Sequence, residues 1–211
     1  MTTDTNRLER QKDKTMRTVT TTTNLYTFNE LDEDTQAKVI DANRDILVDH
    51  EWWDLVVDSF KHEVAPRFGL ECDEVYFSGF SSQGDGACFT GSFCYEKGMR
   101  GKVAALESPE LDKIADYILE IQSRNFYQVS GTIRHRGHYY HSHCTRFEIE
   151  RDDCEMSSDD EFRMKDCYKW LMDWLYQTLE TEYDHLTSEE TIREYLEDSE
   201  CEFTSCGNLH C

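Results

Sequence analysis

Residues 74–93 read EVYFSGFSSQGDGACFTGSF, two β-prone segments separated by the turn sequence Gln83-Gly84-Asp85-Gly86. Aromatic, β-branched and small residues fill both flanking segments, as expected for paired antiparallel strands. Asp-Gly is a frequent hairpin turn because glycine adopts a positive φ at little cost. A phosphate-binding loop would lead into a helix and match GxGxxG or GxxxxGK(S/T), and neither pattern occurs in the sequence. The stretch therefore predicts a β-hairpin.

Strand and helix patterns continue on the N-terminal side of this hairpin and directly after it. Segment 18–28 (TVTTTTNLYTF) is rich in β-branched residues and predicts an N-terminal strand. Asp32 is the expected N-cap of the helix that follows, and a second helix is expected over residues 50–66. Ser108-Pro109, after the hairpin, has the cap-then-proline order of another helix start.

The C-terminal half continues this alternation. Residues 126–150 (FYQVSGTIRHRGHYYHSHCTRFEIE) predict a second hairpin that turns at Arg136-Gly137. Capping boxes that start at Ser158 and Thr187 predict a long helix and a short last helix. The resulting order β-α-α-β-β-α-β-β-α-α predicts an α+β fold. In it, one antiparallel sheet, formed by the N-terminal strand and the two hairpins, packs against helices.

The chain length of 211 residues suits one domain with short extensions. Residues 1–15 are polar and aperiodic, which predicts a disordered N-terminal extension. Residues 16–199 are expected to form a single α+β domain with acidic C-terminal helices. Residues 200–211 are expected to form a loose, cysteine-containing tail.

The charge of the chain is its most unusual property. It has 44 acidic and 22 basic side chains and a formal net charge of −22. The first 20 residues are slightly basic, so the remainder carries 41 acidic and 17 basic groups. A field of this sign repels nucleic acid and anionic membranes, so neither is an expected direct partner.

Targeting and cysteine patterns favour a cytoplasmic protein. No apolar stretch follows the basic N-terminal residues, as a secretory signal would require. No segment approaches the ~20 apolar residues of a membrane span. The nine cysteines are odd in number and scattered, which fits a reducing compartment where thiols stay free.

Several short motifs occur together: LYTFNELDEDTQAKVIDANRDI, then Trp52-Trp53, then FSGFSSQGDGACFTG. In this combination the chain resembles a family of small, uncharacterised proteins encoded by bacteriophages and prophages, over roughly residues 16–150. The resemblance implies a phage origin and the cytoplasm of a bacterial host, and it supplies no catalytic residue. The matching residues are Leu25, Tyr26, Glu30, Leu31, Ala37, Trp52, Trp53, Phe77, Gly79, Phe80, Gln83, Gly84, Asp85, Gly86, Ala87 and Phe89.

The second predicted hairpin is rich in potential metal ligands, namely His135, His138, His141, His143 and Cys144. If the hairpin turns at its Arg-Gly pair, the first two histidines face each other, and the next two share the other face. No single register gathers all four, and no Cys-x-x-Cys partner completes a zinc site. A metal site is therefore not favoured, and we expect neither a cofactor nor an enzyme. A small metal-dependent enzyme that uses residues 135–144 is the alternative.

Acidic residues are concentrated in two C-terminal runs. EIERDDCEMSSDDE (148–161) has eight acidic groups and one arginine, and residues 180–200 add nine more with one arginine. A solvated face explains one short run, and adaptation to salt, supported by only nine lysines, explains a general excess. A third interpretation is that carboxylates on rigid helices imitate DNA phosphates, whose attraction to Lys/Arg channels is largely electrostatic.

This third interpretation predicts a phage-encoded acidic inhibitor that binds and blocks a host nucleic-acid-binding defence enzyme, of restriction or CRISPR type, by DNA mimicry. An antitoxin-like regulatory protein that neutralises a basic toxin shares the same logic and remains an alternative. The expected primary contacts are Asp152, Asp153, Glu155, Asp159, Asp160 and Glu161. The expected secondary contacts are Glu180, Glu182 and Asp184.

Overall fold

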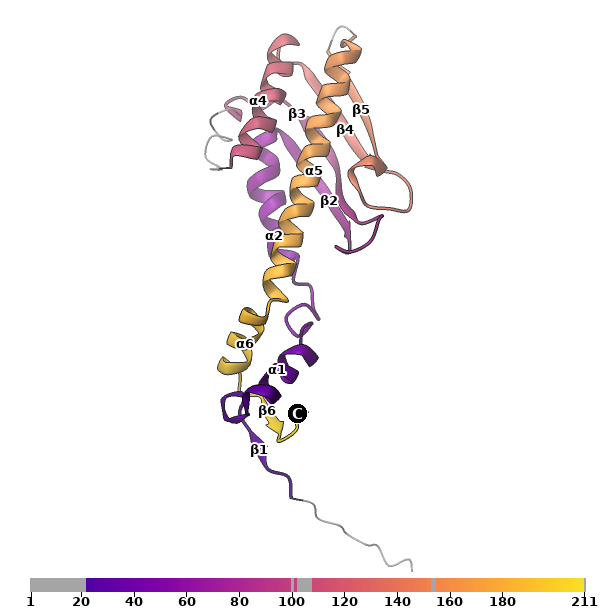
Figure 1. Ribbon diagram of the computed structural model, residues 1–211. Coiled ribbons are helices and arrows are strands. Elements are labelled where there is room, and N and C mark those ends of the chain that lie inside the picture. Colours follow the sequence, from indigo (N-terminus) through magenta and orange to yellow (C-terminus); the bar gives the residue numbers. More distant parts are fainter. Residues whose placement is uncertain (1–21, 100, 102–107, 153–154, 211) are drawn as a thin grey trace, which may run out of the picture.

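The computed structural model describes residues 22–99, 101, 108–152 and 155–210. Within these residues the chain forms two lobes, connected by the end of one long helix and by the segment between residues 42 and 54 (Figure 1). We call residues 52–186 the main lobe, and residues 22–51 together with 187–210 the small lobe. Each lobe has its own cluster of buried apolar side chains. The predicted disorder of residues 1–15 and the start of the predicted first strand lie outside the described residues.

The main lobe contains a four-stranded antiparallel sheet in the order β2-β3-β4-β5. Its strands are β2 (Leu70–Ser78), β3 (Gly86–Cys94), β4 (Val129–His135) and β5 (Thr145–Arg151). Val75 faces Phe89 in the first hairpin, and Ile133 faces Phe147 in the second. A bulge in β2 lies opposite Gly91, where an added Cβ would lie 2.1 Å from the Glu71 carbonyl oxygen.

Helices cover one face of this sheet (Figure 1). They are α2 (Asp54–Ser59), the π-helical turn η2 (Phe60–Val64), the 3-10 turn η3 (Ala65–Phe68), α4 (Pro109–Arg124) and α5 (Ser158–Leu186). The apolar stripe of α5 is fully buried against β3 and α4, with Leu171, Leu175 and Leu179 each 0% exposed. Burial of an apolar stripe at helical spacing is what holds a long amphipathic helix to a sheet.

The small lobe is built from both ends of the described chain. Its elements are β1 (Leu25–Tyr26), the 3-10 turn η1 (Phe28–Glu30), α1 (Glu33–Ala42), α6 (Glu189–Asp198), β6 (Glu202–Thr204) and β7 (Leu209–His210). A three-stranded antiparallel sheet has the order β1-β6-β7. Phe28, Ile40, Ile192, Leu196 and Phe203 form most of its core.

The predicted α+β class, with antiparallel sheets packed against helices, is confirmed. Two details differ. The N-terminal strand does not join the main sheet, because β1 pairs with β6. The last residues are not a loose tail either, because β6 pairs with two strands and Phe203 is 0% exposed.

The predicted helix caps are correct to within one residue. Asp32 accepts a hydrogen bond from the Thr35 backbone N–H at 3.0 Å, and Ser108 caps α4. The caps of α5 and α6 are Ser157 and Ser188, one residue earlier and one residue later than predicted. Within the part of the chain that the structure describes, no helix is long and apolar enough to cross a membrane.

Candidate functional site

The two expected sets of acidic contacts lie at opposite ends of α5. Asp159 is in its first turn and Asp184 is near its last turn. A helix of 29 residues at ~1.5 Å per residue is roughly 43 Å long. The two sets therefore do not form one continuous surface.

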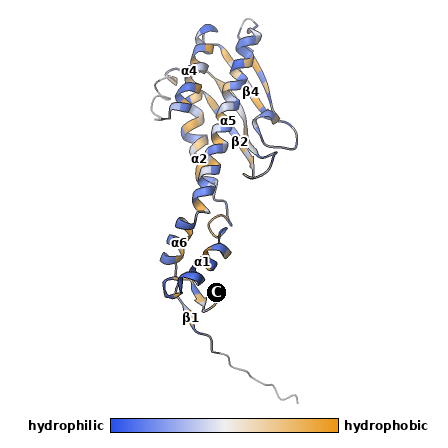
Figure 2. Ribbon diagram, viewed as in Figure 1, coloured by the Kyte–Doolittle hydropathy of each residue, from blue (hydrophilic) through white to orange (hydrophobic). Residues whose placement is uncertain are grey.

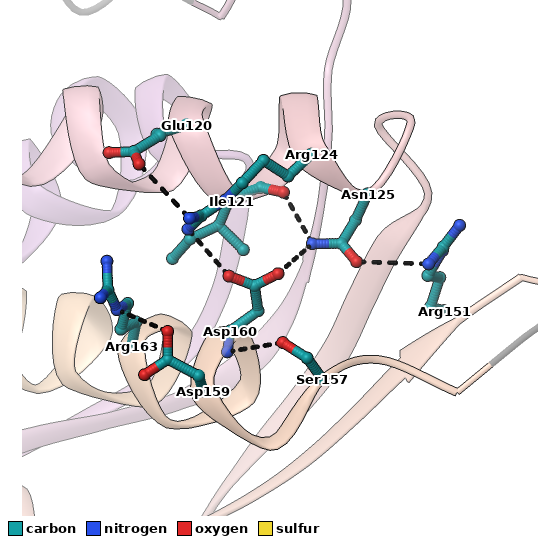
Figure 3. Close-up of polar contacts among 9 residues, drawn as sticks. All are labelled: Glu120, Ile121, Arg124, Asn125, Arg151, Ser157, Asp159, Asp160 and Arg163. Carbon is teal, nitrogen blue, oxygen red and sulfur yellow. Dashed lines mark hydrogen bonds and ion pairs between the residues drawn. The ribbon is translucent and has the colours of Figure 1, made fainter.

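Asp160, at the start of α5, is part of a buried polar network (Figure 3). Its carboxylate lies 2.8 Å from an Arg124 guanidinium nitrogen and accepts a hydrogen bond from Asn125 Nδ2 at 3.0 Å. The same amide nitrogen also donates to the Ile121 carbonyl at 2.8 Å. Asp160 is only 9% exposed and joins the start of α5 to the end of α4. These internal contacts already compensate the charge of Asp160, which argues against its predicted role as a partner contact.

The neighbouring acids of this first set are partly neutralised or lie outside the described residues. Asp159 pairs with Arg163 at 3.1 Å, and Glu161 pairs with Lys165 (Figure 3 shows the first pair). Asp152 and Glu155 are exposed, whereas Asp153 lies outside the described residues. The start of α5 therefore presents less free negative charge than its sequence suggests.

The small lobe carries the highest density of unbalanced charge, because the main lobe reaches the same net charge of −12 only over many more residues. The small lobe has fifteen acidic and three basic side chains, a formal net charge of −12, and every one of the fifteen is exposed. Figure 2 shows how hydrophilic its helices α1 and α6 are. The acids are Glu30, Asp32, Glu33, Asp34, Asp41, Asp45, Asp49, Glu51, Glu189, Glu190, Glu194, Glu197, Asp198, Glu200 and Glu202.

Few of these acids are compensated by a basic side chain. Between small-lobe side chains in the described structure, the ion pairs are Asp41 with Arg44 at 2.8 Å and Glu189 with Arg193 at 3.3 Å. Both pairs are largely exposed, and such pairs contribute only ~0–1 kcal/mol. Most of the lobe's negative charge therefore remains available to a partner.

Helix stability explains only some of these acids. Glu189 and Glu190 lie in the first turn of α6, where carboxylates interact favourably with the helix dipole. Glu197 and Asp198 lie at its last turn, which has no basic residue, so the dipole disfavours them. Acids placed against the dipole need another explanation, and attraction of a cationic partner is one.

The second expected set adjoins this surface. Glu180 and Glu182 are half-buried and Asp184 is exposed, all near the end of α5 that leads into α6. Sequence reasoning missed the N-terminal acids of the surface, from Glu30 to Glu51, and read those at the start of α1 only as helix-capping residues. The acidic run ELDED (30–34) was visible in the sequence, but the proximity of these residues to α6 depends on tertiary structure.

The histidine-rich segment 135–144 does not form two paired strands with a tight turn between them. Residues 136–144 form a long connection that includes the 3-10 turn η4 (Ser142–Cys144), so the predicted turn at Arg136-Gly137 is wrong. His135 stacks on Tyr76 instead of facing His138. In the described structure no three His, Cys, Asp or Glu side chains are grouped to hold a metal ion.

Two of these residues do form a contact of their own. His141 Nε2 lies 3.5 Å from Cys144 Sγ, while His143 is exposed and its ring centroid lies 5.9 Å from that of His141. A nucleophilic cysteine needs a histidine that is itself oriented by a third group. His141 Nδ1 is buried and has no hydrogen-bond partner among the described residues. The pair therefore lacks the orienting contact of a catalytic dyad.

The Gln83–Gly86 turn is structural, as predicted, although for a different reason. Asp85 accepts hydrogen bonds from the backbone N–H groups of Ser81 and Ser82 at 3.0 and 2.6 Å. Neither Gly84 nor Gly86 has a positive φ, so the expected reason for the glycines is wrong. Instead, an added Cβ at Gly86 would lie 2.6 Å from the His141 Cα, because the 136–144 connection packs closely on this hairpin.

Comparison with known proteins places the main lobe in a family. A family model described as "Domain of unknown function (DUF8835)" matches residues 52–189, more than half of the chain. No curated protein and no solved structure matches. The match coincides with the main lobe and extends only to the first residue of α6, so nearly all of the acidic small lobe lies outside it. The chain belongs to the DUF8835 family.

Proposed function

We propose that the protein binds a basic, nucleic-acid-binding protein through the small lobe and the adjoining end of α5. The observation that carries this proposal is the concentration of fifteen exposed acids against three basic residues in the small lobe. A surface of one sign steers an oppositely charged partner and gains free energy from released counterions.

The partner class follows from the geometry of the charge. Carboxylates on α1 and α6 are held by a packed core and by caps, so they form a pre-organised surface. Pre-organisation lowers the entropic cost of binding, as it does for the phosphates of a duplex. A Lys/Arg channel that normally receives nucleic acid is the complementary surface, and DNA mimicry is the proposed mechanism.

The biological setting that we propose is inhibition of a bacterial defence enzyme, of restriction or CRISPR type, by a phage-encoded protein. The sequence resemblance supports the phage origin and the acidic surface supports the partner's charge. An antitoxin-like protein would use the same surface on a basic toxin. The two differ in whether the partner also binds nucleic acid.

Matched charge variants test where binding occurs. One variant neutralises Glu190, Glu194 and Glu197 of α6 to glutamine. The control removes the same number of charges at the other end of α5, at Asp152, Glu155 and Asp159. Each protein is used as bait in nuclease-treated bacterial lysate, eluted with a salt gradient, and its captured proteins are identified by mass spectrometry. Each captured protein is then purified and titrated against labelled duplex DNA.

We expect the α6 variant to lose the captured protein and the control to retain it. The wild-type chain should also displace duplex DNA from that protein in the titration. Simultaneous binding of the chain and DNA would contradict mimicry. Loss of capture only in the control would contradict the assignment to the small lobe. A captured basic protein without affinity for nucleic acid would favour the antitoxin-like alternative.

A further inference from the structure

Helix α2 has no fully buried residue, although its Val56 is half-buried and packs against the core of the main lobe. Leu55 is 83% exposed, more than any other large hydrophobic side chain among the described residues. A soluble protein gains nothing from such a side chain in water, since burial of a leucine contributes ~1.5–3 kcal/mol. Leu55 adjoins further apolar side chains of α2, η2 and α5, and a contiguous apolar patch at the surface marks a site for another molecule.

A groove of about 350 Å³ runs from this face to α5. Leu55, Val56, Phe60 and Val64 line one side, and Trp174 and Leu175 line the other. The volume lies within the ~300–1,000 Å³ range of ligand clefts. Both Phe60 and Val64 come from the π-helical turn η2, and π-turns in proteins are frequent at functional sites. The groove thus lies between two helices and is lined mainly by apolar side chains, with Ser59, Thr178 and Glu182 as its polar lining residues.

The groove floor is formed by buried rings that pack on one another. The Phe60 ring is 1% exposed and lies 5.4 Å from the Phe89 ring of the central strand, measured between centroids. It also lies 6.5 Å from the Trp174 ring across the groove. A pre-formed apolar groove between helices is the geometry that receives the apolar face of an amphipathic helix.

The charged residues around the groove indicate which kind of molecule binds there. Glu182 lines it, and the exposed Asp58 lies three residues after Leu55, hence beside it on the helix surface. No basic side chain lines the groove. A second copy of this chain would bring the same acids together under a net charge of −22 on each molecule, so self-association is disfavoured.

We propose that the groove between α2, η2 and α5 binds an amphipathic helix of a partner protein, with lysine or arginine flanking its apolar face. The apolar face packs on Leu55 and Trp174, and the flanking cations approach Asp58 and Glu182. This surface lies within the family domain. It shares Glu182 with the adjoining end of α5 in the proposed acidic surface, whereas Leu55, Asp58 and Trp174 lie outside that surface.

The probe is a synthetic Leu/Lys amphipathic helix of about 15 residues, long enough to be helical when bound. A scrambled peptide of the same composition retains the charge but lacks the apolar face. Both are titrated calorimetrically at physiological salt into the full chain and into four single variants. Leu55→Gln and Asp58→Asn test the groove. Leu209→Gln and Glu190→Gln remove equivalent groups from the small lobe.

We expect the amphipathic peptide to bind one-to-one and Leu55→Gln to weaken it about tenfold, which is the equivalent of losing one buried leucine. Asp58→Asn should weaken it by a few-fold, whereas Leu209→Gln should leave it unchanged. Equal affinity for the scrambled peptide, or a loss confined to Glu190→Gln, would overturn the proposal and indicate charge attraction to the small lobe. A dimer in sedimentation that Leu55→Gln dissociates would overturn it in favour of self-association.

Discussion

The ring of Phe28 packs edge-on against the ring of Phe203, with 6.4 Å between their centroids and 67° between their planes. The two residues come from opposite ends of the described chain, and both are almost fully buried. The Arg193 guanidinium of α6 lies over the ring of Phe28, 5.9 Å from its centroid. This contact closes the small lobe and gathers acids from both chain ends into one surface.

Phe203→Ala should therefore unfold the small lobe selectively. Truncation of a buried phenylalanine typically costs ~3–5 kcal/mol, a large amount for so small a core. Hydrogen exchange should show lost amide protection in α1 and α6 and retained protection in β3. Leu209→Ala, at the position opposite Phe203 but 40% exposed, is the control and should change little. Uniform loss of protection in both lobes would show that they unfold as one unit.

Asp160→Ala should destabilise the main lobe by about 1–3 kcal/mol, because Arg124 and the Asn125 amide would lose a buried partner. Asp159→Ala, which removes an exposed ion pair with Arg163, should change stability by no more than ~0.5 kcal/mol. Urea denaturation of the two variants measures the difference. Equal effects would mean that Asp160 is not part of a stabilising network.

Gly86→Ala should cost about 1–3 kcal/mol, because the added methyl group would overlap the backbone of His141. Gly84→Ala should cost no more than ~0.5 kcal/mol. The nearest atoms to its methyl group belong to the Tyr139 ring, at 3.0 Å, and that side chain is 56% exposed, so it can shift more easily than buried backbone. Thermal denaturation compares the two, and a larger effect at Gly84 would contradict the packing of the 136–144 connection.

The thiols should differ sharply in reactivity. Burial raises the pKa of Cys88 and of Cys167 to about 12. Hydrogen bonds from Thr204 and Asn208 lower the pKa of Cys206 from its ordinary value of 9.0. Since the thiolate is the reactive form, iodoacetamide at neutral pH should modify Cys206 before the two buried cysteines, as mass spectrometry can measure. Rapid labelling of Cys88 in the native protein would contradict this order.

The same pKa shifts predict how stability depends on pH. Above the ordinary thiol value of 9.0, Cys88 and Cys167 ionise in the unfolded chain but stay protonated in the folded one. The unfolded state then binds fewer protons, so the free energy of unfolding falls as pH rises from about 9 to about 12. Urea denaturation over this range measures the slope, and a Cys88→Ala variant should reduce it.

Local features of the fold were predictable because they depend on residues near each other in the chain. The Asp32 and Ser108 caps act over three residues. The first hairpin follows from two β-prone segments around one turn, and the buried stripe of α5 follows from 3.6-residue spacing. Composition alone also established the excess of negative charge.

Only tertiary structure decided which acids act together. Asp159 and Asp160 are sequence neighbours, yet one is exposed and the other is buried against α4, because helical residues one apart point in different directions. Glu33 and Glu190 are far apart in sequence, yet the contact between Phe28 and Phe203 places both in one lobe. Charge is a property of each residue and can be read from the sequence. The shape of a charged surface depends on long-range burial of apolar side chains, which no local pattern encodes.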